Sequence, residues 1–308
     1  MKHHIALQRL KPWILPAAML SGMIFHNHMG QIEAVAPYLI FIMLFITFCK
    51  VKPRELRITS LSRRLLLVQI GGAVAVYCAL RPFGEALAQG TAICVFCPTA
   101  TAAPVITGLL GGSVPRLATF SIVSNITVAV TAPVFFSLAG AADINFIESM
   151  RGIAMRVVPL IIAPLALALI LLAVAPKAHA AIASRQSWSF YIWALSLFIV
   201  VGRAVSFVMS EPPSMIPQMI AIALCAGAVC GAQFYIGRRI GRSCGDKIAG
   251  AQGLGQKNTV LAIWMALTYL NPISSVGPAA YVAWQNTVNS LQLYYKDKRD
   301  RNADKRKH

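Results

Sequence analysis

Acidic side chains are scarce in this chain, and none of them falls within a long apolar run. Of 308 residues only 10 are Asp or Glu, and charged residues make up 12 % of the chain while hydrophobic residues make up 57 %. A soluble domain of this length carries about twice that fraction of charge, so the composition excludes one. Apolar runs long enough to cross a bilayer recur from end to end. We therefore expect an all-α, polytopic membrane protein.

The apolar runs predict ten transmembrane helices. They cover residues 13–28, 34–50, 65–80, 86–110, 117–140, 154–175, 188–209, 213–236, 248–270 and 273–295. Most of the 28 Lys and Arg residues lie on one side of this arrangement, and the other side holds only Arg81, Arg151 and Arg156. By the positive-inside rule, we expect a protein of the cytoplasmic (inner) membrane with both termini in the cytoplasm. Because topology accounts for the net charge of +18, we do not expect nucleic-acid binding.

Signals for secretion, zinc and disulfides are also missing. No A-x-A-like site follows the first apolar run, so we expect a membrane span there rather than a cleaved signal peptide. Cys94 and Cys97 form a CxxC inside a predicted span, where packing is the simplest interpretation and soft-ligand chemistry the alternative. His26 and His28, at the outer mouth of the first span, leave a similar choice between an interfacial pair and a metal site.

The outer loop near residues 141–153 divides the spans into two sets of five. Because five is odd, the two halves insert in opposite orientations, which is the plan of many secondary transporters. We therefore expect a first inverted repeat at 1–140, a second at 141–296, and a basic cytoplasmic tail at 297–308. Matching spans should then carry matching irregularities.

The fourth span of the first half is predicted to be interrupted at its centre by Pro98 and Pro104. Pro104 has no N–H group and clashes with the preceding turn, so a straight helix is not expected. Thr99 and Thr101 have hydroxyls that suit the cap of a new helix, with the proline in its first turn.

The fourth span of the second half, which is the ninth overall, is predicted to break at Gly253 and Gly255. Asn258 or Thr259 can cap its second piece. Two interruptions at the same position in both halves indicate crossing helices with a binding site at the midplane of the membrane. Ordinary proline and glycine kinks are the alternative interpretation.

Polar side chains recur at depth in the fifth and tenth spans, mostly at helical spacing. They are Ser121, Ser124, Asn125, Gln285, Asn286 and Asn289. Each of them alone could simply join two helices by hydrogen bonds. Beside two interrupted helices, we expect them to line a pocket together with Gln256.

Four stretches of the chain form a set with a familiar pattern. The first two spans contain KPWILPAAMLSGMIF and PYLIFIMLFITFCKVKPRELR, the fourth and fifth read CPTATAAPVITGLLGGSVPRLATFSIVSNITVAVTAPVFFSLAG, and the ninth contains GLGQKNTVLA. These stretches resemble the corresponding helices of the bile acid:sodium symporter family. The resemblance implies a panel of spans 1, 2, 6 and 7 against a core of spans 3–5 and 8–10. It also implies uptake of organic anions, often with two sodium ions bound at the crossing.

The chain departs from that family at its ion-binding positions. Where the family has an acid in helix nine this chain has Gly253, and where it has a sodium-ligating glutamine this chain has Lys257. The family's Ser-Asn pair in helix four is Ala103-Pro104, and one ligand position in helix five is Leu117 while another remains Ser121. We therefore do not expect sodium coupling of the family's kind, and we expect no other cofactor.

Lys257 places an ammonium group near the middle of the membrane. As a structural residue, it could satisfy the open carbonyls that end the first half of the ninth span. As a functional residue, it could attract an anion together with two helix starts, and it could exchange a proton during transport. Arg203, the other cation in a span, is expected to reach the headgroups, and guarding an anion entrance is the alternative.

These observations predict a non-enzymatic carrier of a small organic anion, a carboxylate or a bile-acid-like amphiphile. Its energetics could be proton-coupled, exchange or uniport. Three alternatives stay open: a sodium-coupled symporter with unusual ligands, a passive anion channel, and an arsenite-type efflux carrier that uses Cys97. An intramembrane enzyme is not expected, because the spans contain neither a His–carboxylate pair nor zinc-like spacing.

Overall fold

The computed structural model describes residues 17–49, 58–100, 103–140, 146–185 and 187–304. All regular elements in these ranges are helices. Five of them are long and apolar enough to cross a membrane: His26–Phe48, Ser60–Phe83, Val114–Gly140, Arg151–Val174 and Pro213–Ser243. These features are those of a membrane-embedded helical protein.

The helices follow one another with short connections. After a helical stretch at residues 17–24, the chain forms η1 (His26–His28), α2 (Met29–Ile32), η2 (Glu33–Val35), α3 (Ala36–Phe48), α4 (Ser60–Leu80), η4 (Arg81–Phe83), α5 (Glu85–Phe96), α6 (Ala103–Leu110), α7 (Val114–Gly140), α8 (Phe146–Val174), α9 (Pro176–Ser184), α10 (Ser187–Ser210), η5 (Pro213–Met215), α11 (Ile216–Ser243), α12 (Lys247–Gly255), α13 (Thr259–Tyr269), η6 (Pro272–Ser275) and α14 (Val276–Asp304).

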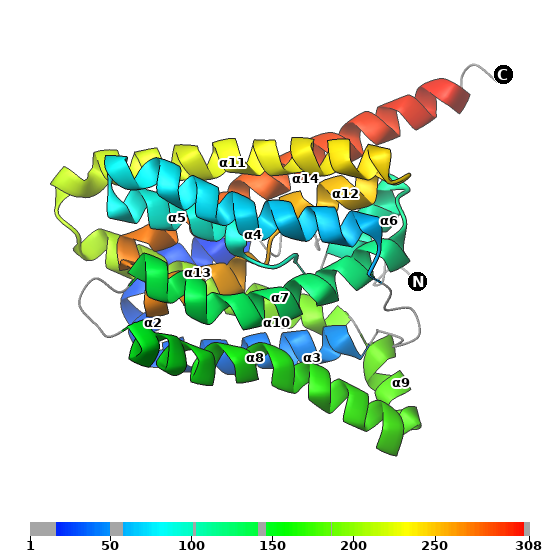
Figure 1. Ribbon diagram of the computed structural model, residues 1–308, viewed down its shortest axis with the longest axis horizontal. Coiled ribbons are helices and arrows are strands. Elements are labelled where there is room, and N and C mark those ends of the chain that lie inside the picture. Colours follow the sequence, from blue (N-terminus) through cyan, green and yellow to red (C-terminus); the bar gives the residue numbers. More distant parts are fainter. Residues whose placement is uncertain (1–16, 50–57, 101–102, 141–145, 186, 305–308) are drawn as a thin grey trace.

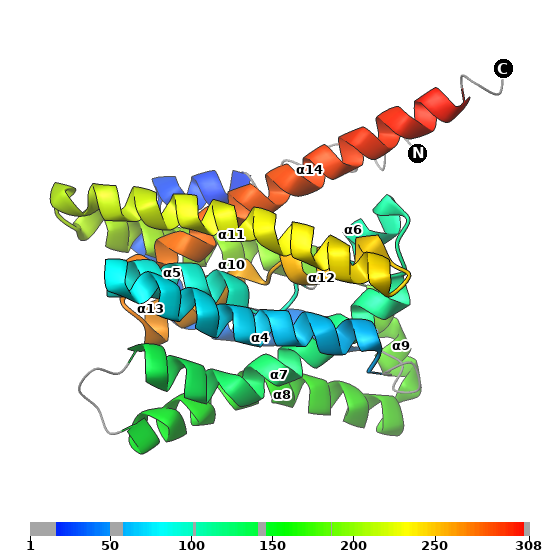
Figure 2. The ribbon, with the colours of Figure 1, turned by 45° about the horizontal axis from the view of Figure 1, so that its top comes forward.

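The long helices lie roughly side by side, with the four short helices α5, α6, α12 and α13 among them (Figures 1 and 2). Helix α11 packs against α5, α12 and α14, and α4 packs against α5. Helix α3 packs against α8 and α10, on the other side of the molecule in Figure 1. The short helices are thereby held between longer ones, and the ends that face the two interruptions, at Phe96, Ala103, Gly255 and Thr259, are buried.

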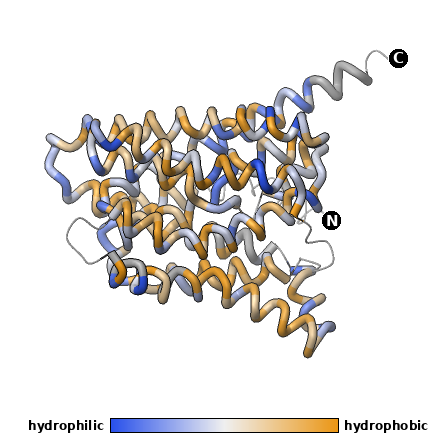
Figure 3. The backbone as a smooth tube through the Cα atoms, in the orientation of Figure 1, coloured by the Kyte–Doolittle hydropathy of each residue, from blue (hydrophilic) through white to orange (hydrophobic). Residues whose placement is uncertain are grey.

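The polarity of this packing suits a lipid environment. Hydrophobic residues predominate along most of the helices (Figure 3), and large apolar side chains such as Leu67, Leu138 and Ile170 are exposed. Polar side chains such as Gln69 and Gln233 are buried instead. Lipid can cover the apolar exterior, whereas buried polar groups need partners inside the protein.

Two helical stretches were not anticipated. Helix α14 continues to Asp304, into the stretch predicted as a basic tail at 297–308. No glycine or proline follows Pro278 in this helix, and alternating charges at its end favour continuation. The connection after the sixth predicted span also contains a helix, α9, that the sequence analysis did not anticipate.

Candidate functional site

The interruptions predicted in the fourth and ninth spans are present, and they lie against each other. Helix α5 ends at Phe96 and α6 begins at Ala103, while α12 ends at Gly255 and α13 begins at Thr259. The intervening segments pair in an antiparallel bridge between Thr99 and Lys257. We call the place where these two segments meet the crossing. The Ala100 N–H donates to the Gln256 carbonyl at 2.9 Å, and the Asn258 N–H donates to the Pro98 carbonyl at 2.8 Å. The two extended segments thus satisfy each other's backbone groups, as buried chain requires.

The sequence explains where α5 stops and α6 starts. Proline disfavours helical geometry in the residue before it, and Cys97, which precedes Pro98, has φ −52° and ψ 146°. Pro104 lies in the first turn of α6, where its missing N–H group costs nothing. The two prolines therefore act as predicted, one ending a helix and the other beginning one.

The prediction that Gly253 and Gly255 break the ninth span is wrong in position. Both glycines lie inside α12, and the break follows them at residues 256–258. Neither glycine has positive φ, so backbone freedom is not their purpose. A Cβ on Gly255 would lie 2.4 Å from ring atoms of Phe234, and one on Gly253 would lie 3.0 Å from Phe120. The glycines allow α12 to approach its neighbours closely.

Helix α13 begins with the cap that the sequence predicted. The Asn258 side chain accepts from the Leu261 N–H at 3.2 Å, which confirms Asn258 as the cap residue. Thr259 is the first residue of the helix. The start of α13 and its positive end of the helix dipole are therefore fixed at the crossing.

Lys257 is buried at the centre of the crossing, with 1 % of its surface exposed. Its ammonium donates to the carbonyl of Val95 at 2.7 Å and to that of Cys97 at 3.0 Å. Its backbone N–H donates to Gln285 Oε1 at 2.8 Å. The carbonyls that it satisfies belong to the end of α5, so the expectation that it would serve its own interrupted helix is wrong. The lysine instead ties one interrupted helix to the other.

Two glutamines complete the end of α5. The last four carbonyls of a helix have no partner within it. Gln69 Nε2 of α4 donates to the carbonyls of Phe96 at 2.8 Å and Cys97 at 3.1 Å. Gln233 Nε2 of α11 donates to the carbonyl of Cys94 at 3.3 Å. Neither glutamine was predicted to belong to the site. The signal that could have identified them was an amide side chain within an apolar run, in the third and eighth predicted spans.

Hydroxyl groups serve the end of α12. The Thr99 hydroxyl donates to the Gly253 carbonyl at 2.8 Å, and the Tyr281 hydroxyl donates to the Gly255 carbonyl at 2.9 Å. The prediction that Thr99 caps α6 is therefore wrong, because its hydroxyl binds a carbonyl of α12 on the other side of the crossing. Thr101 lies outside the described residues.

The other predicted residues divide into two groups. Ser121 and Ser124 reach the crossing, where both bind the backbone of Thr99. The Thr99 N–H donates to Ser124 Oγ at 3.4 Å, and the Ser121 hydroxyl donates to the Thr99 carbonyl at 3.5 Å. The Ser124 hydroxyl also donates to Gln69 Oε1 at 2.8 Å. Asn125 donates within its own helix, to the carbonyl of Ser121.

The predicted polar residues of α14 also differ in their roles. Gln285 binds the Lys257 backbone, as described above. Asn289 accepts from Gln252 of α12 at 3.0 Å, so it joins two helices away from the bridge. Asn286 is only half-buried. The structure therefore brings Gln285 alone of these three into contact with Lys257.

Several buried polar atoms at the crossing have no hydrogen-bond partner among the described residues. They are Asn258 Nδ2, Thr259 Oγ1 and Gln256 Oε1, and Asn125 Oδ1 of α7 is unpaired as well. Buried polar atoms in native proteins are nearly always paired, so an unpaired group indicates a ligand or a water. Two of these atoms, on Asn258 and Thr259, are potential donors at the start of α13.

Comparisons with known proteins do not indicate which ligand or reaction this site serves. No protein-family model matches this chain, and no curated protein matches it. Among the described residues, no group of three or more His, Cys, Asp or Glu residues could hold a metal ion. The site is therefore interpreted from its own geometry.

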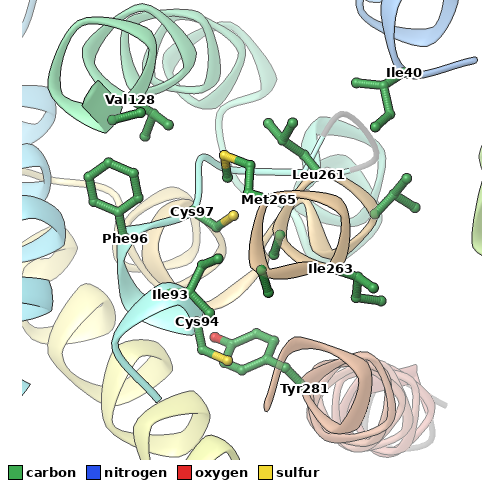
Figure 4. Packing of buried hydrophobic residues seen from close by; sticks show 14 of the residues in the cluster. Ile40, Ile93, Cys94, Phe96, Cys97, Val128, Leu261, Ile263, Met265 and Tyr281 are labelled. Atoms are coloured by element: carbon green, nitrogen blue, oxygen red, sulfur yellow. The ribbon is translucent and has the colours of Figure 1, made fainter. Parts of the chain in front are cut away.

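The CxxC cysteines are packing residues. Cys94 and Cys97 are free, buried thiols within the main hydrophobic cluster (Figure 4). The Cys94 thiol donates to the Gly90 carbonyl at 3.1 Å, inside its own helix. Cys97 contributes its carbonyl, not its thiol, to the binding of Lys257.

Arg203 forms an ion pair with Glu33, a partner that was not predicted. The expectation that Arg203 reaches the headgroups stays a prediction. Both side chains are partly exposed and line a cavity of about 350 Å³. Trp264 and Thr268 of α13 form part of the opposite wall. This cavity lies between α3, α10 and α13, on the side that the positive-inside rule assigns to the exterior.

Proposed function

We propose that this chain is a secondary carrier of a small organic anion, related to the bile acid:sodium symporter family. Helices α5/α6 and α12/α13 are the fourth and ninth of ten spans, in two inverted repeats. Helices α4, α7, α11 and α14 complete the core. Residues 17–48, α8 and α10 form the panel, and substrate crosses by alternating access between panel and core.

The observation that carries this proposal is the buried ammonium of Lys257 beside unpaired donors on α13. Asn258 Nδ2 and the Thr259 hydroxyl are buried without partners at the positive end of that helix. A helix start favours negative charge, and the fixed cation adds to this field with no carboxylate among its hydrogen-bond partners. A substrate carboxylate is the ligand that best satisfies such donors.

The same geometry argues against sodium at this position. The carbonyls of Val95 and Cys97 are acceptors of the kind that hold a cation, and the Lys257 ammonium already binds both. We propose that the lysine is the built-in cation of this carrier. Reversible loss of its proton would couple the movement of the anion to the proton gradient.

The outer cavity supports a route to the crossing. It is bounded by α3 and α10 of the proposed panel and by α13 of the proposed core. Arg203 attracts anions there, and its ion pair with Glu33 must exchange partners when an anion binds. Arg203 at this cavity and Lys257 at the crossing would then both attract the anion.

The first experiment measures uptake of labelled pantoate, a small carboxylate, into proteoliposomes. One set has an inward sodium gradient, and a second has a proton gradient in sodium-free buffer. We expect uptake that ignores sodium and follows the proton gradient, with saturable counterflow that distinguishes a carrier from a channel. Uptake that requires sodium would contradict the role given to Lys257, and uptake without counterflow would favour a channel.

Two variants test the lysine directly. Lys257→Gln keeps hydrogen-bond donors and removes the charge, so we expect a folded protein that has lost proton-dependent uptake. Lys177→Met removes a charge from the exposed surface of α9 and should transport normally. If Lys257→Gln retains both its substrate affinity and its pH dependence, the lysine has a structural role only.

A further inference from the structure

A second cavity lies at the end of the molecule that the positive-inside rule assigns to the cytoplasm. It is a groove of about 500 Å³ between the end of α6, the start of α12, and parts of α11 and α14. Its lining residues are Leu110, Arg238, Lys247, Ile248, Val288, Leu291, Gln292, Tyr295 and Lys296. We call this cavity the inner groove.

The inner groove combines positive charge with apolar walls. Arg238, Lys247 and Lys296 line it, and no acidic residue is among the lining residues that the structure describes. Leu291 and Tyr295 are 50 % and 64 % exposed, so the apolar wall is open to the surroundings. Asp246, which precedes Lys247 in the chain, is already occupied: its two carboxylate oxygens accept from the N–H groups of Ser113, Ile248 and Ala249.

We infer that the inner groove binds one anionic phospholipid of the adjacent leaflet. The phosphate lies between Arg238 and Lys247, and an acyl chain follows Leu291 and Val288 toward the membrane interior. Charge complementarity selects the headgroup, because basic side chains at the membrane surface attract anionic lipid. The apolar wall explains why a lipid, and not a free phosphate, is the ligand.

Because of where the inner groove lies, a bound lipid would contact both interrupted helices. Its lining comes from both interrupted helices, through Leu110 at the end of α6 and through Lys247 and Ile248 at the start of α12. Gln292 of α14 also accepts from Gln252 of α12 at 3.2 Å. A bound lipid would therefore hold α6 and α12 together at the ends that lie away from the crossing, whereas Lys257 acts at the crossing itself, on the end of α5. This inference does not depend on transport.

The test measures lipid binding to the purified full-length protein by native mass spectrometry. Phosphatidylglycerol is compared with phosphatidylcholine of the same acyl chains, and with glycerol phosphate as the headgroup alone. The groove variant is Arg238→Gln/Lys247→Gln. Its matched control, Arg239→Gln/Arg242→Gln, removes two exposed charges from α11 that do not line the groove.

We expect phosphatidylglycerol to bind in preference to phosphatidylcholine, and the groove variant to lose affinity by roughly 30-fold. Each cation near the membrane surface contributes about a fivefold factor. The control should lose much less affinity, because its two guanidinium groups do not line the groove, and Arg238→Lys/Lys247→Arg should retain binding. Equal losses in both double variants, equal binding of the two lipids, or equal binding of glycerol phosphate would each overturn the inference.

Discussion

The ends of α5 and α12 meet the same requirement with different chemistry. Both helices stop inside the protein, where their last carbonyls need donors. At α5 the donors are the ammonium of Lys257 and the amides of Gln69 and Gln233. At α12 they are the neutral hydroxyls of Thr99 and Tyr281.

The comparison shows how a crossing can acquire a charge. Hydroxyls satisfy carbonyls without adding charge, whereas the ammonium brings a full positive charge into a region whose other polar groups are neutral. The two ends are also reciprocal: Thr99, from the break after α5, serves α12, and Lys257, from the break after α12, serves α5. Substitutions at these residues test whether the charged end differs from the neutral end in energy as well as in chemistry.

The largest effect is expected for Lys257→Met. It removes two charge-assisted hydrogen bonds and leaves the carbonyls of Val95 and Cys97 buried without these donors, so we expect a loss of about 4 kcal/mol in unfolding free energy. Thermal and denaturant unfolding in detergent measures this loss, with Lys177→Met as the control. A loss of less than about 1 kcal/mol would mean that the ammonium contributes no more than a neutral donor does.

A smaller effect is expected for Gln69→Leu. Gln69 donates to two carbonyls and accepts from the Ser124 hydroxyl, so its removal should cost about 3 kcal/mol. Gln233→Leu removes two bonds instead of three, to the Cys94 carbonyl at 3.3 Å and to the Tyr281 hydroxyl at 3.0 Å, and should cost less in the same assay. If the two variants are equally unstable, the end of α5 does not depend mainly on Gln69.

Gly255→Ala tests the neutral end through packing. The new Cβ would overlap the Phe234 ring, and overpacking of this kind costs about 2 kcal/mol. Phe234→Leu in the same chain should recover part of the loss, which a double-mutant cycle would measure. Gly231→Ala is the control, because nothing lies within 4 Å of its added Cβ. Absence of coupling between positions 234 and 255 would contradict this account of the glycine.

The smallest effects are expected at the neutral donors. Thr99→Val removes one hydroxyl hydrogen bond and should cost about 1 kcal/mol in unfolding free energy. Tyr281→Phe removes the bond to the Gly255 carbonyl and the bond that Gln233 Nε2 donates to the hydroxyl, and should cost about 1.5 kcal/mol. Proton-dependent uptake of pantoate by proteoliposomes should persist in both, since the charge of Lys257 remains. Loss of uptake in a stable Tyr281→Phe variant would place the functional difference at α12 instead.

Local chemistry made part of this arrangement predictable. Pro98 ends a helix through its effect on Cys97, and Asn258 caps one through its own side chain, so each can be identified from adjacent residues. The partners of Lys257 could not be identified, because Val95 lies 162 residues away along the chain. The roles of Gly255 and Arg203 depend in the same way on distant contacts, with Phe234 and Glu33. A pattern in one sequence indicates burial and helix ends, but it does not indicate which distant carbonyl a donor will meet.

Helix α14 is uninterrupted and long enough that a small tilt near Lys257 would produce a larger displacement at its far end. The helix has 29 residues and therefore extends about 43 Å, well beyond the hydrocarbon thickness of about 30 Å. Gln285, in the first half of the helix, accepts from the Lys257 N–H, and the C-terminal end of the helix projects away from the bundle (Figure 2). A tilt of α14 about its contact with Lys257 would move the projecting end further than the contact itself. A spin label at Lys298, paired with one at Lys177, would measure any such movement.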